Sequence, residues 1–413
     1  MIYLDSGATT LQKPKQVFRA VQKAMESCAN PGRSGHKPAR EAERVVYSCR
    51  EEAAELFGLD RPERVVFTQN ATHSLNLAIK SLLHEGGHAV ITGYEHNSVV
   101  RPLEAMKGQG VTYTAVSSCL FDPEDMARQM ERAITEETRC MIVCHASNVF
   151  GSIAPLDELD RICLRHGLPM IVDASQSAGT LPLSAKKYPS AAFFCMPGHK
   201  GLYGPQGTGL LICCKDNPLY TIMEGGTGSR SLEVTQPDFL PDALESGTLN
   251  VPGIAGLWEG LKFIKQQGEK EILRWEQELI GTLVQQLKGH PSLRVFAGGE
   301  NQGGVLSVVF PIPSEEAAKK AGRPGNLRPG RAPLCTPGPP HRRNPARRHC
   351  TPERFGVQHK AGDAPGRRCH GQNVNELKMF PVFSFLILKR RALIDSIISK
   401  LYIENRCFHG ICR

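Results

Sequence analysis

Six short apolar runs alternate with amphipathic segments between residues 60 and 215, and this alternation limits the possible fold more than any other feature. The runs are RVVFT (64–68), HAVIT (88–92), CMIVCH (140–145), PMIVDA (169–174), AAFFCM (191–196) and GLLICC (209–214). Segments between them, such as THSLNLAIKSLL and LDELDRICLRHG, have helical spacing. Apolar strands separated by helices predict an α/β fold with a mostly parallel sheet covered on both faces. Functional residues are then expected at the carboxyl ends of the strands.

A second, smaller unit is expected after this alternation. GIAGLWEGLKFIKQQG and EKEILRWEQELIGTLVQQLKG have helical patterns, and LRVFAG and GGVLSVVFPI have the composition of strands. We therefore expect an N-terminal segment at residues 1–15, a large domain at 16–255 and the start of a small α+β domain at 256–320.

Several classes of protein are disfavoured by the same sequence. The longest apolar run, FPVFSFLIL, is far shorter than the roughly 18 residues of a membrane span, so no membrane partner is expected. The 14 cysteines form no C-x-x-C pair and no Cys/His cluster, so we expect reduced thiols and no metal site. The first residues, MIYLDSGATT, lack the basic and apolar regions of a secretory signal, which favours a cytoplasmic protein.

Lys200 and Asp173 are the two strongest candidate functional residues. Lys200 follows an apolar run and precedes a glycine-rich stretch, where a lysine shielded from water has a lowered pKa suited to Schiff-base chemistry. Asp173 ends another apolar run, where a carboxylate can pair with a cationic ring nitrogen such as that of pyridoxal phosphate. The ordinary alternatives are a surface lysine and an aspartate that caps a helix.

Three further candidates follow other apolar runs. The turn TQNATHSLNLAI opens a helix whose free N–H groups, with the hydroxyl of Thr72, form a candidate phosphate site, although on its own the turn is better explained as a plain N-cap. His96 is placed to stack on a flat cofactor and to move protons. Asn148 is placed to hydrogen-bond a cofactor or a substrate carboxylate.

Eight motifs in a fixed order point to a known family. They are IYLDSGATT, NPGRSGH, TQNATHSLNL, EHNSV, HASNVFG, IVDASQSAG, PGHKGLYGPQGTG and ESGTLNVPGI, and they extend over residues 1–320. In these motifs the chain resembles the class V aminotransferase superfamily, specifically the cysteine desulfurases and selenocysteine lyases. The resemblance implies a homodimeric fold-type I enzyme dependent on pyridoxal 5'-phosphate, with a seven-stranded sheet between helices in the large domain.

The resemblance also implies roles for single residues. Lys200 would hold the cofactor covalently, Asp173 would contact its pyridine nitrogen, and Gln176 its ring hydroxyl. The other implied contacts are His96 stacked over the ring, Thr72 and His199 at the phosphate with Ala71 beside them, Asn148 near cofactor and substrate, and Thr248 reaching the phosphate from the partner subunit.

The implied reaction removes sulfur from L-cysteine. Lys200 or His96 would move the α-proton, alanine would leave, and a loop cysteine would keep the sulfur as a persulfide for a sulfur-acceptor protein. Two alternatives stay open: another class V lyase or aminotransferase, such as a selenocysteine lyase, or a product that binds the cofactor and is inactive.

The family pattern stops after Lys320. Residues 321–373 contain ten arginines and one lysine against Glu353 and Asp363, so this segment accounts for the chain's whole formal net charge of +9. Its nine prolines and eight glycines are typical of a disordered segment. The family's loop with the nucleophilic cysteine and its carboxylate-binding arginine are not recognisable here, but codons for residues 325–343 read one base later can encode such a loop.

We therefore interpret residues 321–413 as an aberrant, frameshifted and largely disordered tail, with the frameshift near residues 320–325 and an impaired activity. Cys335 lies near the expected nucleophile, but its codon only overlaps the shifted one, so that role is not assigned to it. The alternative interpretation is an arginine-rich nucleic-acid-binding tail. No aromatic platform or known nucleic-acid fold accompanies the arginines, so no nucleic-acid partner is expected.

Overall fold

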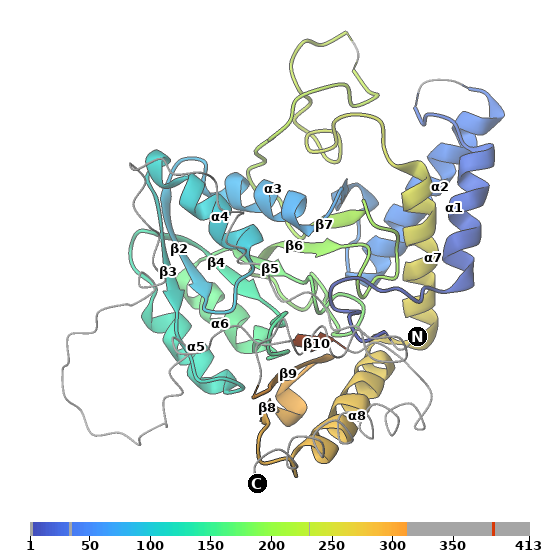
Figure 1. Cartoon of the computed structure of the whole chain (residues 1–413). Helices are drawn as coiled ribbons and strands as arrows, with labels where there is room; N and C mark the ends of the chain where they lie inside the picture. Colours follow the sequence, from blue (N-terminus) through green and yellow to red (C-terminus); the bar gives the residue numbers. More distant parts are fainter. Residues whose placement is uncertain (1–2, 33–34, 231, 312–381, 385–413) are drawn as a thin grey trace, which may run out of the picture.

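A seven-stranded sheet lies at the centre of the computed structural model, which describes residues 3–32, 35–230, 232–311 and 382–384 (Figure 1). The strand order is β1-β7-β6-β5-β4-β2-β3, and β7 runs in the direction opposite to the other six strands. The mostly parallel sheet predicted from the apolar runs is therefore confirmed. The strands are β1 Val65–Thr68, β2 Gly87–Thr92, β3 Val111–Val116, β4 Thr138–Cys144, β5 Met170–Asp173, β6 Ala191–Pro197 and β7 Gly209–Cys213.

All six apolar runs form strands, whereas β3 was not predicted. It lies at the edge of the sheet and pairs with β2 alone. Its residues Thr112 and Thr114 face outward between buried ends, so the run VTYTAV lacks the continuous apolar character of a central strand. An edge position therefore explains why its signal was weak.

Helices cover both faces of this sheet (Figure 1). On one face α3 and α4 pack against the strands, and on the other α2, α5, α6 and α7 do so. Neighbouring residues of β6 show the division, since Phe193 packs with α3 and α4 while Phe194 packs on the opposite face, both fully buried. The helices are α1 Lys15–Ser27, α2 Lys37–Leu56, α3 Ala71–Leu83, α4 Asn97–Ala105, α5 Pro123–Arg132, α6 Leu156–His166, α7 Val251–Gln267 and α8 Glu269–Leu287.

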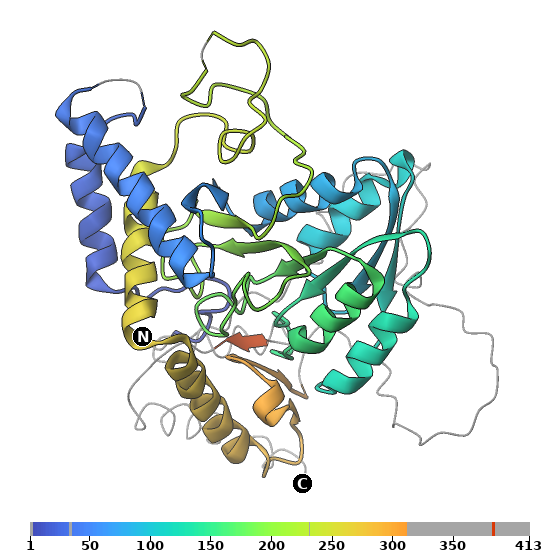
Figure 2. The ribbon, with the colours of Figure 1, turned by 180° about the vertical axis from the view of Figure 1, so that it is seen from behind.

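A second sheet of three antiparallel strands lies beside α8 (Figure 2). Its order is β10-β9-β8, with β8 Arg294–Phe296, β9 Val305–Val309 and β10 Val382–Ser384. The two strands expected in LRVFAG and GGVLSVVFPI are β8 and β9. The apolar side of α8 packs on β9, and Leu4 from the N-terminal segment joins the same cluster.

The predicted domain bounds remain a prediction. The expected boundary after residue 255 falls inside α7, and both views show α7 beside α1 and α2 (Figures 1 and 2). Of residues 321–413 the structure describes only Val382–Ser384, so the predicted frameshift, the predicted disorder and Cys335 lie outside the described residues. Within the described ranges, every helix is too short or too polar to cross a membrane.

Candidate active site

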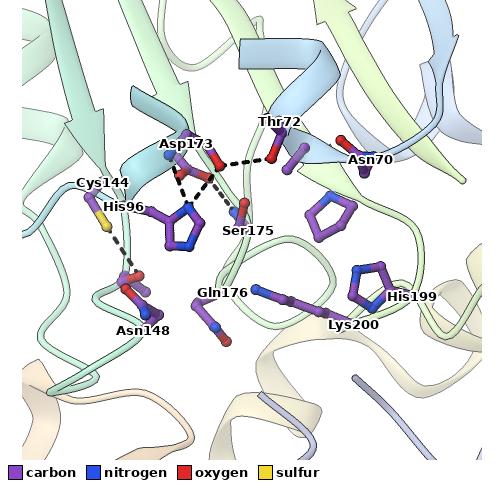
Figure 3. Close-up of a pocket in the computed structure, with 14 residues that line it drawn as sticks. Asn70, Thr72, His96, Cys144, Asn148, Asp173, Ser175, Gln176, His199 and Lys200 are labelled. Carbon is purple, nitrogen blue, oxygen red and sulfur yellow. Dashed lines mark hydrogen bonds between the residues drawn. The ribbon is translucent and has the colours of Figure 1, made fainter. Parts of the chain in front are cut away.

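Most of the predicted site residues meet at one edge of the seven-stranded sheet. The parallel strands β2, β4, β5 and β6 end there, and a cavity of about 160 Å³ opens beyond their carboxyl ends (Figure 3). The predicted residues that line it are Ala71, Thr72, His96, Asn148, Asp173, Gln176, His199 and Lys200. The others in the lining, which were not predicted, are Asn70, Ser98, Cys144, Ala146, Ser175 and Pro197.

Lys200 follows β6, and its side chain extends toward Gln176 and His96 (Figure 3). Burial lowers the pKa of its amine, and the opposing attraction of Asp173 is the weaker effect. The neutral amine, which is the nucleophilic form, is therefore favoured.

Close packing fixes the backbone around this lysine. A Cβ on Gly198 would collide with the side chain of Thr208, and one on Gly201 would collide with the carbonyl of Ala178. The hydroxyl of Thr10 also donates to the carbonyl of Lys200 at 2.6 Å. The glycines thus let neighbouring chain segments approach closely and hold Lys200 from both sides.

Asp173 stands at the end of β5 and is almost completely buried. Its Oδ1 accepts a hydrogen bond from the backbone N–H of Ser175 at 2.9 Å, and a turn rather than a helix follows. Glu95 is a second buried carboxyl nearby, and its Oε1 accepts from Thr92 Oγ1 at 2.6 Å and from Cys144 N at 2.7 Å. Burial, reinforced by the charge of Asp173, raises the pKa of Glu95 to about 8. Glu95 is therefore protonated at neutral pH.

The N-terminus of α3 supplies the cavity's candidate anion site. Asn70 caps the helix, with its Oδ1 accepting from the backbone N–H of His73 at 2.9 Å. The first turn contains no acidic residue, so the positive end of the helix dipole faces the cavity at Ala71 and Thr72. The N-cap expected from the sequence is thus Asn70, and the start of α3 stays a candidate anion site.

Two histidines reach the cavity in their neutral form. Burial lowers the pKa of His96, whose Nδ1 accepts from the backbone N–H of Ser98 at 3.1 Å and so caps α4. Burial, with the nearby cations Lys200 and Lys13, lowers the pKa of His199 to about 4. At neutral pH both rings can therefore donate or accept a hydrogen bond without carrying charge.

Gln176 and Asn148, which follow the neighbouring strands β5 and β4, complete the predicted residues that line the cavity. Gln176 follows β5, and its Nε2 donates to the carbonyl of Gly7 at 3.0 Å, which ties the N-terminal segment to the cavity. Asn148 follows β4 and lines the wall beside Cys144 (Figure 3). Amide side chains at these places can orient a polar ligand by hydrogen bonding.

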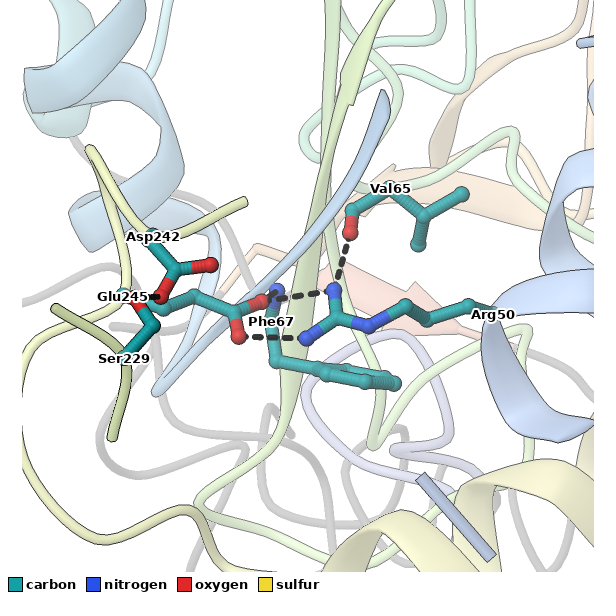
Figure 4. A network of polar contacts seen from close by, with 6 residues as sticks. All are labelled: Arg50, Val65, Phe67, Ser229, Asp242 and Glu245. Atoms are coloured by element: carbon teal, nitrogen blue, oxygen red, sulfur yellow. Dashed lines mark hydrogen bonds and ion pairs between the residues drawn. The ribbon is translucent and has the colours of Figure 1, made fainter. Parts of the chain in front are cut away.

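Thr248 lies outside this cavity. It is exposed, near the end of the long segment between β7 and α7 that projects away from the three-stranded sheet (Figure 1). Three residues earlier, Glu245 is buried and anchors this segment to the large sheet (Figure 4). The Arg50 guanidinium donates to both Glu245 oxygens, from Nη1 at 2.8 Å and from Nη2 at 2.5 Å, and the backbone N–H of Phe67 donates to Glu245 as well.

Some unpredicted lining residues had a sequence signal. Ser175 stands two residues after Asp173, the spacing of a turn in which an aspartate side chain accepts from the backbone. Asn70 stands at the N-cap position of a recognised helix. Ser98 stands two residues after His96, whose side chain accepts from the Ser98 backbone N–H and so caps α4. Cys144 lies within the apolar run at residues 140–145 and carried no separate signal.

Comparisons with known proteins agree with this architecture. The sequence model described as Aminotransferase class-V matches residues 2–321. A protein named "Probable cysteine desulfurase" from Methanothermobacter thermautotrophicus is 30% identical over 314 residues, which are 74% of this chain and 77% of that protein. Another of that name, from Mycolicibacterium paratuberculosis, is 27% identical over 319 residues, 75% of this chain but only 46% of its own length.

Among solved structures, the apo cysteine desulfurase of Thermococcus onnurineus NA1 shares the fold. Its TM-score is 0.80 at 23% identity, over 98% of this chain and 94% of that chain. The fold predicted from the resemblance, with its mostly parallel seven-stranded sheet between helices, is confirmed.

Proposed function

This chain belongs to the aminotransferase class-V family and is a cysteine desulfurase-like enzyme, and on that basis we propose that it uses pyridoxal phosphate to remove sulfur from L-cysteine, yielding alanine. One observation carries the proposal. A buried amine, a buried carboxylate and a helix N-terminus free of acidic residues line the same cavity. These are the three groups that the aldehyde, the ring nitrogen and the phosphate of this cofactor require.

The donors fit pyridoxal phosphate group by group. Lys200 would hold the aldehyde carbon, because its neutral amine is favoured by burial. Asp173 would hold a proton on the ring nitrogen, and Gln176 would contact the ring hydroxyl. Ala71 and Thr72, with His199, would bind the phosphate at the start of α3. When bound, the cofactor supplies a ring that stabilises negative charge on the carbon next to the substrate amine.

Proton transfer would then fall to residues that the cavity already contains. Lys200, neutral once released, can take the proton from the α-carbon of the substrate. His96 carries its proton on Nε2, because its Nδ1 accepts from the backbone N–H of Ser98. Nε2 could therefore give a proton to the substrate's β-carbon, which keeps the electron pair of the C–S bond when an attacking thiol takes the sulfur. Asn148 would orient the substrate from the opposite wall.

A homodimer would complete the phosphate site. Within one chain Thr248 lies outside the cavity, and the segment that carries it exposes Leu232 and Val234 fully to solvent. A projecting segment with exposed apolar side chains suits contact with a second copy of the chain. Thr248 would thereby reach the phosphate bound by the partner, as the family resemblance implies.

We also propose that turnover is weak. The family's nucleophilic cysteine and carboxylate-binding arginine belong after residue 320, where the family pattern ends. Cys144 lines the cavity, but burial raises the pKa of its thiol well above the usual range, so it is a poor nucleophile. Persulfide formation and delivery to a sulfur-acceptor protein in the cytoplasm would therefore be impaired.

The test is to incubate the protein with pyridoxal phosphate, L-cysteine and an excess of an external thiol, and to measure alanine and sulfide. We expect the visible absorbance of lysine-bound cofactor and slow alanine formation, both lost in Lys200→Ala and both kept in the matched control Lys80→Ala. L-selenocysteine, and an amino acid paired with a keto acid, tested in the same way, distinguish the related lyases and aminotransferases. Fast sulfide release would contradict the impairment, and absence of the absorbance in folded protein would contradict the cofactor.

A further inference from the structure

Three side chains in the cavity form a continuous chain of hydrogen bonds (Figure 3). Thr72 Oγ1 lies 2.8 Å from Ser98 Oγ, and Ser98 Oγ lies 2.7 Å from His96 Nδ1. The backbone N–H of Ser98 also donates to the same Nδ1 at 3.1 Å. Ser98 is almost completely buried, whereas Thr72 and His96 are open to the cavity.

The direction of each hydrogen bond follows from that backbone donor. Since Nδ1 of His96 accepts from an N–H, the neutral ring carries its proton on Nε2. The Ser98 hydroxyl must then also donate to Nδ1, and its own oxygen accepts from the Thr72 hydroxyl. The protons therefore point from Thr72 through Ser98 to His96, and both donors to Nδ1 stabilise the neutral imidazole.

We propose that Ser98 is a positioning residue that couples the binding of an anion at Thr72 to the protonation of His96. The inference rests on the proposed function only for the roles given to the two ends, a phosphate at Thr72 and proton transfer at His96.

An anion at the start of α3 would reverse the chain of hydrogen bonds. Thr72 has one hydroxyl proton, and a phosphate oxygen competes for it more strongly than the Ser98 hydroxyl does, because the bond is charge-assisted. The Thr72 oxygen is then free to accept, and the Ser98 hydroxyl turns toward it. Nδ1 loses one donor and gains the lone pair of Ser98 as an acceptor. Both changes favour a proton on Nδ1, and they act against the Ser98 backbone N–H, which still points at that nitrogen.

Other charged groups surround His96 and set the background for this effect. Asp173 on β5 favours the protonated ring, while Lys200 after β6 and Arg101 on α4 oppose it, all of them weaker than burial. The neighbouring Glu95 is protonated at neutral pH, and His199 across the cavity is neutral. An anion also favours the protonated ring directly by charge, so the contribution of Ser98 has to be separated by substitution.

The consequence for the reaction is an order of events. With the phosphate site empty, His96 is held in its neutral form, and with the site filled it can hold a second proton. The doubly protonated ring, a stronger proton donor to the substrate carbon than the neutral ring, is thereby favoured only when the phosphate site is filled.

The experiment uses the full chain freed of cofactor and labelled with ¹⁵N-histidine, with sulfate as the probe because its charge is constant between about pH 5 and 9. NMR follows the two ring nitrogens of His96 against pH, and His96→Gln assigns the signal. We expect the Nε2–H form without sulfate and a higher pKa of His96 with it. By linkage, sulfate binds more tightly below that pKa than above it, by about fivefold for the gain of one hydrogen bond.

Substitutions separate the hydroxyl chain from direct charge attraction. In Ser98→Ala we expect the sulfate-induced rise in the His96 pKa to shrink toward the part due to charge alone. Thr72→Val should reduce the sulfate-induced rise in the His96 pKa in the same way while leaving Ser98 in place. The two variants therefore test the same chain of hydrogen bonds independently, should one of them misfold. Ser175→Ala, a serine-to-alanine change in the same cavity but outside the chain of hydrogen bonds, should leave the rise unchanged.

The proposal is overturned by an equal rise in the wild type and in Ser98→Ala, by no rise at all, by a lack of sulfate binding, or by a neutral form with its proton on Nδ1. None of these measurements uses pyridoxal phosphate. Failure of the proposed function would show instead as a cofactor that does not bind while the coupling of sulfate and His96 is intact.

Discussion

In the seven-stranded sheet every strand supplies side chains to two apolar clusters, one on each face, whereas the three-stranded sheet is packed through one small cluster with α8 and Leu4. All of the predicted residues that line the cavity follow strands of the large sheet. The candidate site is therefore carried by the part of the molecule with the most buried apolar surface, which holds its geometry. The N-terminal segment joins the two regions, since Leu4 packs with α8 while Thr10 holds the backbone of Lys200.

Truncating one core residue in each sheet tests most strongly whether the candidate site depends on the core of the seven-stranded sheet alone. Phe194→Ala in β6 removes a fully buried ring beneath the site, and we expect a loss of about 3–5 kcal/mol in the free energy of unfolding together with weakened cofactor binding. Leu306→Ala in β9, also fully buried, should cost about 2–4 kcal/mol but leave cofactor binding in place. Denaturant melts and cofactor titrations measure both. Equal loss of cofactor in the two variants would contradict the separation.

The buried ion pair between Arg50 and Glu245 tests how firmly the projecting segment is held to the large sheet. Arg50→Ala leaves a buried carboxylate without its partner, so we expect a loss of about 3 kcal/mol in the free energy of unfolding. The double variant Arg50→Met/Glu245→Leu should recover most of that loss, because no unpaired charge is then buried. If the double variant is no more stable than Arg50→Ala, the loss in the free energy of unfolding does not come from the unpaired Glu245 carboxylate.

The large sheet should also respond to acid through His145, which follows β4. Burial is the main cause that lowers its pKa to about 3, so the folded chain keeps this ring neutral, whereas the unfolded chain protonates it near 6.5. The free energy of unfolding should therefore fall as the pH drops from 6.5 toward 3, by about 1.4 kcal/mol per pH unit. His145→Gln should flatten this slope in denaturant melts. An unchanged slope would assign the acid sensitivity to other groups.

Glu276 on α8 should give the opposite response beside the three-stranded sheet. Burial raises its pKa to about 8 against the hydrogen bond from Gly304 N–H, so the folded chain keeps it protonated. Its contribution is present below pH 4.5 and is lost as the pH rises through 8. Glu276→Gln should reduce the fall in the free energy of unfolding at high pH. The part of that fall that comes from Glu95 beside the large sheet should remain. At high pH, hydrogen exchange should show greater protection of α8 in Glu276→Gln than in the wild type. An increase in protection confined to β4 would contradict the assignment to Glu276.

How well the sequence predicted each strand depended on how fully that strand is buried. The strands buried on both faces were recognisable because burial demands continuous apolar runs, and the half-exposed edge strand β3 escaped because its outward threonines interrupt the run. The direction of β7 was not predicted, because an apolar run has the same composition in either direction.

The site was predictable where chemistry restricts the residue type at a strand end. Lys200, Asp173, His96 and Thr72 met that condition, and the cavity brings them together. Ser98 and Glu95 escaped, because their importance arises only from contacts between α3, α4, β4 and the turn after β2. Such contacts depend on how distant segments pack and leave no local pattern.

The most direct test of the central claim is to trap the cofactor on the protein. Borohydride reduction of the full chain loaded with pyridoxal phosphate, followed by proteolysis and mass spectrometry, locates any lysine bonded to it. We predict one pyridoxyl group per chain, on Lys200. A group on another lysine, or no group on folded protein, would contradict the assignment of this cavity as the cofactor site.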